Sequence, residues 1–276
     1  MTETRAKVSL STVSTKVPKK TPPRIVIHGM GDVGKTSFAA QFPKPFFLQS
    51  PGETGLETLI STGQLKPVAR VEKPVETWNE LLDWIDELFV GEHDYKTLVL
   101  DTASGCCRLL HEHICKTEYN GDWGPKGMAH YQHGFKECTP IWHQFLFTLD
   151  KLRLKRGMTI VLLMHSDIKN FKNPQGADYD RYTPDMLKDD WNRTFGWADA
   201  VLFMNFVVET EKASANDAKK IVTGGSERAF FAENAGAYDA KGGRYGLPPV
   251  IALPNNPADA YKHFISIVTK ENTDGN

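Results

Sequence analysis

Short apolar runs alternate with segments of helical periodicity along most of the chain. The runs are β-branched or leucine-rich, as expected of strands buried on both faces of a parallel sheet. They lie at 25–27, 45–49, 97–102, 157–165 and 199–206. Helices are predicted at 77–90, 105–117 and 139–156, the last with Pro140 in its first turn, where proline is permitted. This alternation predicts an α/β fold with a mainly parallel sheet and helices on both faces.

The pattern changes in the last third of the chain. Short runs separated by turn residues predict a C-terminal antiparallel meander, with strands at 207–208, 220–222 and 228–231. A closing helix is predicted at 257–269. We expect one domain over 23–270, a flexible basic tail over 1–22 that includes Arg5 and Lys7, and a frayed end over 271–276.

Composition excludes several classes of protein. With 276 residues, 40 % of them hydrophobic, the chain can bury a sizeable core. Lys+Arg 33 against Asp+Glu 34 gives a formal charge of −1, so any contact with nucleic acid must come from a local patch. No apolar run approaches the roughly 18 residues of a membrane helix, and no signal peptide is visible. We therefore expect no membrane partner, a cytoplasmic location and four cysteines that remain thiols.

The most specific motif directly follows the first apolar run. Residues 29–36 read Gly-Met-Gly-Asp-Val-Gly-Lys-Thr and match G-x-x-x-x-G-K-[ST], the P-loop, at every fixed position. In a P-loop, backbone N–H groups turn toward phosphate oxygens, the lysine reaches the β- and γ-phosphates, and the hydroxyl holds Mg²⁺. We predict a nucleoside triphosphate site with Mg²⁺ on Thr36, built from Gly29, Met30, Gly31, Asp32, Val33, Gly34, Lys35, Thr36 and Ser37.

Three further polar residues follow predicted strands and are candidates for the same site. Asp101 ends the run Leu98–Leu100 and is expected to hold Mg²⁺ through water, as the second acid of an NTPase does. Glu53 would orient the attacking water, and His165 would sense the γ-phosphate by hydrogen bonding. The alternatives are a cap of the next helix for Asp101, an acidic turn residue for Glu53 and a satisfied buried histidine for His165.

A stretch rich in cysteine and histidine raises the question of zinc. Cys107, His111 and Cys115 are spaced to lie on one face of a predicted helix, yet no C-x₂-C pair accompanies them. A half-buried helical face explains this spacing more simply than a metal site does. Whether 106–143 binds metal stays open at this stage.

Two segments combine cations with aromatic side chains, as single-stranded nucleic acid sites do. The first spans 119–136 and offers Trp123 and Lys126. The second spans 166–190 and also carries several aspartates, which weaken the case; its candidates are Lys169, Phe171, Lys172 and Arg181. A solvated lid is the alternative interpretation of both segments.

Taken in order, these motifs resemble a phage and prophage family of AAA-type, RecA-like ATP-binding proteins linked to single-strand annealing and recombination. The resemblance rests on the P-loop, the Glu53 loop, Leu-Val-Leu-Asp-Thr at 98–102, the Gly/Trp loop, the run 159–166 with its Phe-Lys-Asn-Pro continuation, Trp-Ala-Asp-Ala-Val-Leu-Phe at 197–203, and 237–248. It covers most of 24–253.

The resemblance implies a P-loop NTPase with a RecA-like core, in which the His165 strand lies between those of the P-loop and Asp101. It implies ATP, Mg²⁺, single-stranded DNA, self-assembly into a homo-oligomer and, as a further partner, a single-strand-binding protein. It matches Glu53 to the catalytic glutamate, His165 to the sensing residue and the two segments to DNA-facing loops. Cations that would reach a neighbouring subunit's phosphate are Arg228, Lys241 and Arg244.

The leading hypothesis is a DNA-dependent ATPase of phage recombination. A nucleotide-gated binding module with little hydrolysis is the first alternative, and DNA-stimulated phosphate release would separate the two. A P-loop small-molecule kinase is the second, but its lid needs several arginines and 166–190 contains only Arg181. A motor on duplex DNA would be revealed by directional movement.

Overall fold

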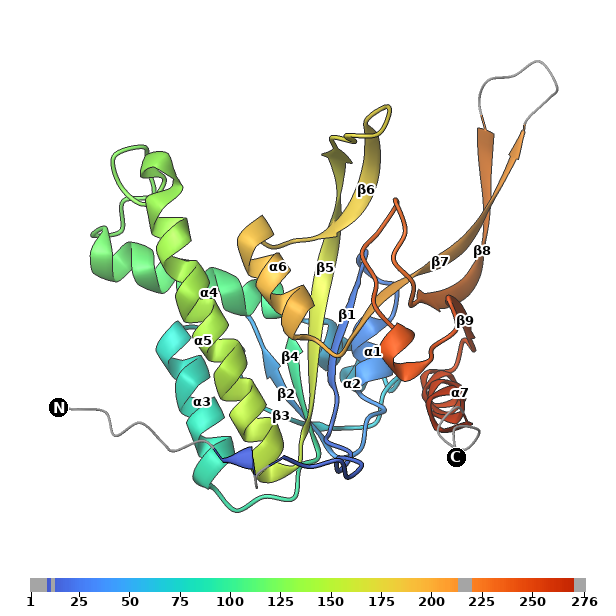
Figure 1. Cartoon of the computed structure of the whole chain (residues 1–276), viewed down its shortest axis with the longest axis horizontal. Helices are drawn as coiled ribbons and strands as arrows, with labels where there is room; N and C mark the ends of the chain where they lie inside the picture. Colours follow the sequence, from blue (N-terminus) through green and yellow to red (C-terminus); the bar gives the residue numbers. More distant parts are fainter. Residues whose placement is uncertain (1–8, 11–12, 213–219, 271–276) are drawn as a thin grey trace.

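The computed structural model describes residues 9–10, 13–212 and 220–270 (Figure 1). The predicted frayed end at 271–276 lies outside the described residues, as do Arg5 and Lys7 of the predicted basic tail. Those residues of the tail that are described, up to Thr21, are exposed. No helix in the described part of the chain is long and apolar enough to cross a membrane.

A nine-stranded sheet forms the centre of the fold, in the order β3-β2-β4-β5-β1-β7-β8-β9, with β6 paired to β5. The strands from β3 to β7 in this order are parallel, while β7–β8, β8–β9 and β5–β6 are antiparallel. The bounds are β1 Arg24–Gly29, β2 Pro45–Gln49, β3 Ala69–Arg70, β4 Thr97–Asp101, β5 Thr159–Phe171, β6 Tyr179–Pro184, β7 Ala200–Lys212, β8 Lys220–Phe231 and β9 Val250–Leu253.

Helices cover both faces of the sheet, because alternate side chains of each central strand point to opposite sides. Val26 of β1 belongs to one buried cluster, with residues of α3, α4 and α5, whereas Ile25 and Ile27 belong to a second, with residues of α1, α2 and α7. The two groups of helices flank the sheet in Figure 1. The bounds are α1 Lys35–Ala39, α2 Gly55–Ser61, α3 Trp78–Val90, α4 Ala103–Glu118, α5 His133–Arg156, α6 Lys188–Trp197 and α7 Pro257–Lys270.

The order of the central strands places the predicted site residues at one edge. β5 lies between β1 and β4, as expected for the His165 strand. Gly29 is paired with His165 across β1 and β5, and Gln49 with Asp101 across β2 and β4. The P-loop, Asp101, His165 and the loop of Glu53 therefore meet at the carboxyl ends of the parallel strands, where α/β proteins bind ligands.

The segment 166–190 differs from the polar loop that the sequence predicts. β5 does not end at His165 but continues to Phe171 and turns back as β6, forming a hairpin with Ser166 opposite Pro184. Figure 1 shows this hairpin standing out from the sheet. Polar residues hid these strands from the apolar pattern, because β5 is exposed after Ser166 and most of β6 is only half-buried.

Two other sequence-based boundaries are also wrong. The three short strands expected after residue 206 are parts of only two long strands, β7 and β8, whose described residues pair in antiparallel fashion with a bulge near Val207. The long helix starts at His133 rather than at 139, so Pro140 lies inside α5. Pro140 is exposed, so the carbonyl that it leaves without a helical partner can be satisfied by water.

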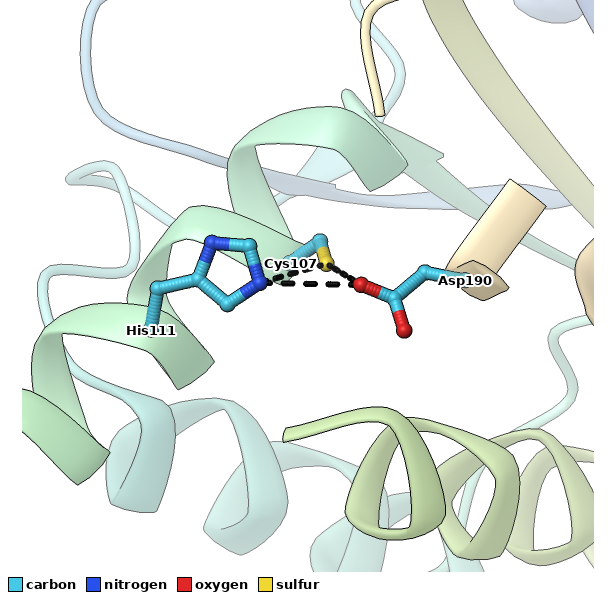
Figure 2. Close-up of side chains that lie close together, drawn as sticks. All are labelled: Cys107, His111 and Asp190. Atoms are coloured by element: carbon cyan, nitrogen blue, oxygen red, sulfur yellow. Dashed lines mark hydrogen bonds and ion pairs between the residues drawn. The ribbon is translucent and has the colours of Figure 1, made fainter. Parts of the chain in front are cut away.

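Helix α4 contacts α6 through one polar group of side chains. Cys107 and His111 of α4 face Asp190 at the start of α6 (Figure 2). Cys115, the third residue of the spacing seen in the sequence, is buried but does not join this group. The predicted half-buried face is therefore divided, with two of its residues against α6.

Candidate functional site

The P-loop connects β1 to α1, and two of its glycines are required by close packing. Gly34 adopts a φ of 97°, and a Cβ there would meet the guanidinium of Arg228 at 2.3 Å. A Cβ on Gly29 would lie 2.1 Å from the carbonyl oxygen of Met204 in β7. A larger residue at Gly29 would force the loop away from the β7 backbone, whereas at Gly34 it would be strained by the positive φ and would displace the Arg228 side chain.

The Lys35 ammonium lies inside this loop. Its Nζ donates to the carbonyl oxygens of Gly29 at 3.0 Å and of Met30 at 2.7 Å. The residue is 5 % exposed. The loop thus wraps around a buried positive charge.

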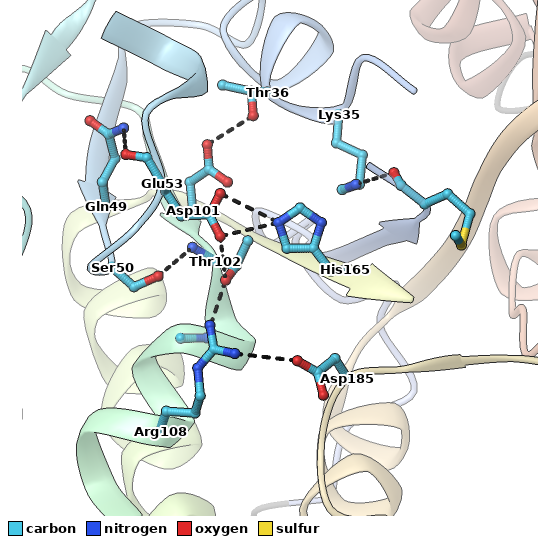
Figure 3. Close-up of polar contacts among 12 residues, drawn as sticks. Lys35, Thr36, Gln49, Ser50, Glu53, Asp101, Thr102, Arg108, His165 and Asp185 are labelled. Carbon is cyan, nitrogen blue, oxygen red and sulfur yellow. Dashed lines mark hydrogen bonds and ion pairs between the residues drawn. The ribbon is translucent and has the colours of Figure 1, made fainter. Parts of the chain in front are cut away.

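Thr36 and Asp101 are brought together as predicted for a pair of magnesium ligands. The Thr36 hydroxyl donates to Asp101 Oδ2 at 2.9 Å (Figure 3). A hydroxyl and a carboxylate at this spacing are the hard oxygen donors that Mg²⁺ prefers, usually with several of its own waters retained.

Glu53 and His165 also meet, although 112 residues separate them along the chain. The His165 Nε2–H donates to Glu53 Oε1 at 3.1 Å, and the Thr102 hydroxyl donates to the same oxygen at 3.3 Å (Figure 3). The hydrogen bond from His165 is the largest cause that holds the pKa of Glu53 below its usual range. Glu53 is therefore a carboxylate held in place by two donors.

A cavity of about 440 Å³ unites these groups. It is lined by the P-loop on one side and by the start of α2 on the other. Lys35, Thr36, Glu53, Asp101 and His165 all contribute to its wall.

Electrostatics shows which ligand fits this cavity. Burial lowers the pKa of Lys35 to about 8, an effect that the carboxylates of Asp101 and Glu53 partly offset. Burial raises the pKa of Asp101 to about 6. Each charge is therefore costly to the folded chain on its own. A phosphate beside Lys35 and a divalent cation beside Asp101 would supply the missing opposite charges, so the residues present fit a magnesium–nucleotide complex.

Sequence reasoning missed two residues that position the acids. Ser50 Oγ accepts a hydrogen bond from the backbone N–H of Thr102 at 3.1 Å. This N–H belongs to the peptide bond between Asp101 and Thr102, which is cis. Thr102 caps α4, since its Oγ1 accepts from the Gly105 N–H at 3.1 Å, and it also donates to Glu53. A threonine between a strand-end aspartate and a helix is a capping signal that the sequence offered.

The three predicted trans-acting cations lie in different places. Arg228 contacts the P-loop of its own chain, with Nη1 donating to the carbonyl of Val33 at 3.3 Å and Nη2 to that of Asn255 at 2.7 Å. Lys241 donates to the carbonyl of Phe195 at 2.6 Å and covers that residue's ring. Arg244 lies exposed in a 3₁₀ turn, Gly243–Tyr245, outside the cavity.

The residues predicted to bind DNA are mostly free of the core. Lys169, Phe171 and Lys172 are exposed at the outer part of the β5–β6 hairpin, and Trp123 and Lys126 are exposed in the loop after α4. Arg181 differs, because its Nη2 pairs with Asp239 at 2.7 Å and its guanidinium lies 5.2 Å from the Phe171 ring. It holds the hairpin against the segment around Asp239.

A buried histidine connects the P-loop strand to the base of this hairpin. The His28 Nε2–H donates to the backbone carbonyl of Asp239 at 2.7 Å, which leaves Nδ1 to accept from the Ser166 hydroxyl at 2.9 Å. Burial lowers the pKa of His28 from 6.5 to about 4. The ring is therefore neutral near pH 7.

This histidine predicts a loss of stability in acid. Between pH 6.5 and about 4 the unfolded chain holds a proton on His28 that the folded chain excludes, so stability falls as the pH falls. From about pH 7.5 to about 5 the loss due to this group should be about 2 kcal/mol. Urea denaturation at both pH values gives the free energy of unfolding. Between the two pH values, this free energy should fall by about 2 kcal/mol less in His28→Gln than in wild type. His263→Gln, an exposed histidine on α7, is the control and should behave as wild type; equal pH dependence of all three proteins would contradict the assignment.

Comparison with known families agrees with this geometry. A family model described as AAA domain matches residues 21–243. The match spans the P-loop, Glu53, Asp101, His165 and the strands from β5 to β8. A search of curated proteins gives no match.

Proposed function

Because this chain belongs to the AAA domain family of nucleotide-binding P-loop ATPases, we propose that it hydrolyses ATP and acts on single-stranded DNA in phage recombination or annealing. The observation that carries the DNA part is the continuity of β5. The same strand bears His165 in the nucleotide cavity and, after Ser166, the exposed Lys169, and the exposed Lys172 directly follows the end of the strand. A change at the γ-phosphate could be transmitted along one strand to the hairpin.

The roles within the cavity follow from position. Lys35 neutralises phosphate charge, and Thr36 with Asp101 would hold Mg²⁺, which supplies charge neutralisation of the phosphates when bound. Glu53 would accept a hydrogen bond from the attacking water and then its proton, while the hydrogen bond from His165 keeps the carboxylate oriented. Arg228 stiffens the P-loop in its own chain.

The proposed DNA surface consists of the hairpin and the loop after α4. Figure 1 shows both extending from the same side of the molecule, above the carboxyl ends of the strands. Lysines there would neutralise phosphates, and Trp123, which is 47 % exposed, offers a ring on which a base could stack. The hairpin also carries Asp167, Asp178 and Asp180, so we expect few phosphate contacts.

The decisive experiment measures ATP turnover with and without single-stranded DNA. A companion experiment measures how the affinity for single-stranded DNA depends on salt. For about three or four neutralised phosphates, the slope of log affinity against log salt should be about −2 to −3 per protomer. Lys169→Ala combined with Lys172→Ala should flatten that slope. Trp123→Ala should weaken DNA binding but leave the slope unchanged. Lys66→Ala removes an exposed lysine before β3, at the other end of the strands, and should have no effect.

Fluorescence anisotropy of labelled oligonucleotides gives these values in ATP, in ADP and without nucleotide. Tighter binding in ATP supports the β5 connection. If a folded, assembled protein binds no single strand in any of the three conditions, the DNA proposal fails.

We further propose a homo-oligomer in which Arg244 reaches the nucleotide of a neighbouring subunit. Arg244→Ala and Lys35→Ala proteins should each be inactive, yet an equal mixture should recover about one quarter of wild-type turnover, the share of interfaces in which both residues are intact. The matched control is Arg228→Ala mixed with Lys35→Ala. Because Arg228 contacts the P-loop of its own chain, that mixture should show no more turnover than the average of the two proteins measured separately. Absence of rescue in both mixtures would rule out the trans role.

One observation favours a second function, a nucleotide-gated binding module with slow hydrolysis. Glu53 already receives hydrogen bonds from His165 and Thr102, which compete with an attacking water. DNA-stimulated phosphate release separates this module from an ATPase. A kinase is disfavoured, because Arg181, the one arginine of 166–190, is paired with Asp239. The phage setting, the cytoplasmic location and a single-strand-binding partner remain part of the proposal.

A further inference from the structure

A second group of reactive side chains lies outside the nucleotide cavity. Among the residues that the structure describes, Cys107, His111 and Asp190 place one potential metal-ligand atom each within 4.8 Å of the others. Cys107 Sγ is 3.6 Å from His111 Nε2 and 3.5 Å from Asp190 Oδ2, and His111 Nε2 is 3.6 Å from Asp190 Oδ2. Figure 2 shows the three atoms turned toward one another between α4 and α6.

These three distances match one face of a coordination tetrahedron. With zinc bonds of about 2.3 Å to sulfur and about 2.1 Å to nitrogen and oxygen, tetrahedral angles separate the ligand atoms by about 3.4–3.6 Å. A hydrogen-bonded histidine–carboxylate pair would instead approach to about 2.7–2.9 Å. From this geometry we propose that Cys107 Sγ, His111 Nε2 and Asp190 Oδ2 form a zinc site.

The chemistry of the donors also favours zinc. A thiolate, an imidazole and a carboxylate form the mixed S/N/O set that Zn²⁺ accepts, whereas Mg²⁺ and Ca²⁺ require oxygen donors. Asp190 is fully buried and Cys107 is 2 % exposed, so a bound cation would compensate a carboxylate held away from water. His111, with 11 % of its side chain exposed, gives solvent a route to the fourth position.

A supporting residue from a third helix holds the carboxylate. The Thr139 hydroxyl of α5 donates to Asp190 Oδ1 at 2.7 Å, which leaves Oδ2 directed at Cys107 and His111. Metal sites commonly orient their ligand carboxylates in this way. The site therefore has three ligands and an orienting partner, contributed by α4, α5 and α6.

A zinc ion here would fix α6 to α4, two helices that flank the nucleotide site. Helix α4 starts directly after Asp101 and Thr102. The segment before α6 contacts the site as well, since the Asp185 N–H donates to the carbonyl of His165 at 2.9 Å and Asp185 pairs with Arg108 of α4 at 3.4 Å. With three protein ligands, a water would occupy the fourth position of the zinc, and the group is separate from the cavity that holds Lys35 and Glu53.

The test is metal content of the full-length chain, with and without added Zn²⁺ after removal of metal by a chelator. We expect one zinc per chain and a rise in melting temperature on adding Zn²⁺. Co²⁺ should replace it and give the sulfur-to-metal absorption band of a thiolate ligand. Cys107→Ser should lose that band, and His111→Gln should lower zinc affinity by about 100-fold or more, a ligand counting for at least as much as its orienting partner.

Two matched pairs of variants separate metal binding from packing. Cys115→Ser, a buried thiol on the same helix outside the group, should bind zinc as wild type does. Thr139→Ala should weaken binding by about 10- to 100-fold, and Thr139→Ser, which keeps the hydroxyl, should restore it. If Cys107→Ser does not fold, the absorption band of the wild-type protein and the zinc affinity of His111→Gln, a change at a partly exposed residue, still test the site.

Folded wild-type protein that takes up no zinc, or Co²⁺ that binds without a sulfur band, would overturn the site. Equal zinc binding by His111→Gln would do the same. The zinc test is independent of the proposed function. If the protein binds zinc but does not hydrolyse ATP, the zinc site is supported and the proposal of an ATPase fails.

Discussion

Glu53→Gln is expected to leave ATP binding intact and to slow hydrolysis by about 10²- to 10⁴-fold, the usual contribution of a general base. Glutamine keeps the size of the side chain and its ability to accept from His165 and Thr102, so the local structure should persist. What is lost is the charge that orients and polarises the water. Turnover under saturating ATP and affinity in a binding titration would be measured on the same preparation.

Glu57→Gln is the matched control for this experiment. Glu57 is an acid on α2 near the cavity, but its carboxylate is engaged with Gln49 at 2.8 Å and with Arg70 at 3.3 Å. We expect its turnover to remain near that of wild type. If Glu53→Gln also turns over normally, Glu53 is only a turn residue and another group positions the water.

Lys35→Ala is expected to weaken triphosphate binding by about 10- to 100-fold, the value of one charge-assisted contact of about 1.5–3 kcal/mol. Turnover should fall to background, because the same ammonium neutralises charge on the transferred phosphoryl group. The fold should survive, since the buried lysine is an electrostatic cost to the chain without a ligand, as the lowered pKa of about 8 indicates. Calorimetric titration with ATP, together with circular dichroism, would measure both effects.

Lys44→Ala provides the control, because Lys44 is an exposed lysine just before β2, at the other end of the strands. Its removal should change neither affinity nor turnover. Unchanged ATP affinity in Lys35→Ala would contradict the assignment of the P-loop itself.

The proposed zinc site and the nucleotide site each contain a buried carboxylate, and the surroundings of the two carboxylates favour different metals. In the cavity, the Asp101 carboxylate accepts a hydrogen bond from Thr36, and burial, which raises its pKa to about 6, makes its charge costly without a cation beside it. Asp190 is held by Thr139 and faces two soft or borderline donors. The first arrangement favours a hydrated Mg²⁺, and the second favours a metal that binds sulfur.

The sequence by itself determined the features that depend on neighbours along the chain. The spacing of residues 29–36 specified a P-loop, and the apolar runs that form β1, β2 and β4 were recognised because strand burial repeats locally. Lys35, Thr36 and Asp101 could be assigned to one site because each follows a parallel strand, and the carboxyl ends of such strands share an edge. Polar strands escaped this reasoning, so β6 and the outer part of β5 were expected to form a polar loop.

Only the tertiary structure decided the contacts between distant residues. Arg228 lies against Val33, 195 residues away, and donates to its carbonyl, a contact with its own P-loop that no local pattern encodes. Cys107 and His111 are one helical turn apart, yet their third partner is Asp190 and not Cys115, because α6 packs on that face of α4. Helical periodicity reports which residues share a face, whereas the packing of the sheet and helices determines what that face meets.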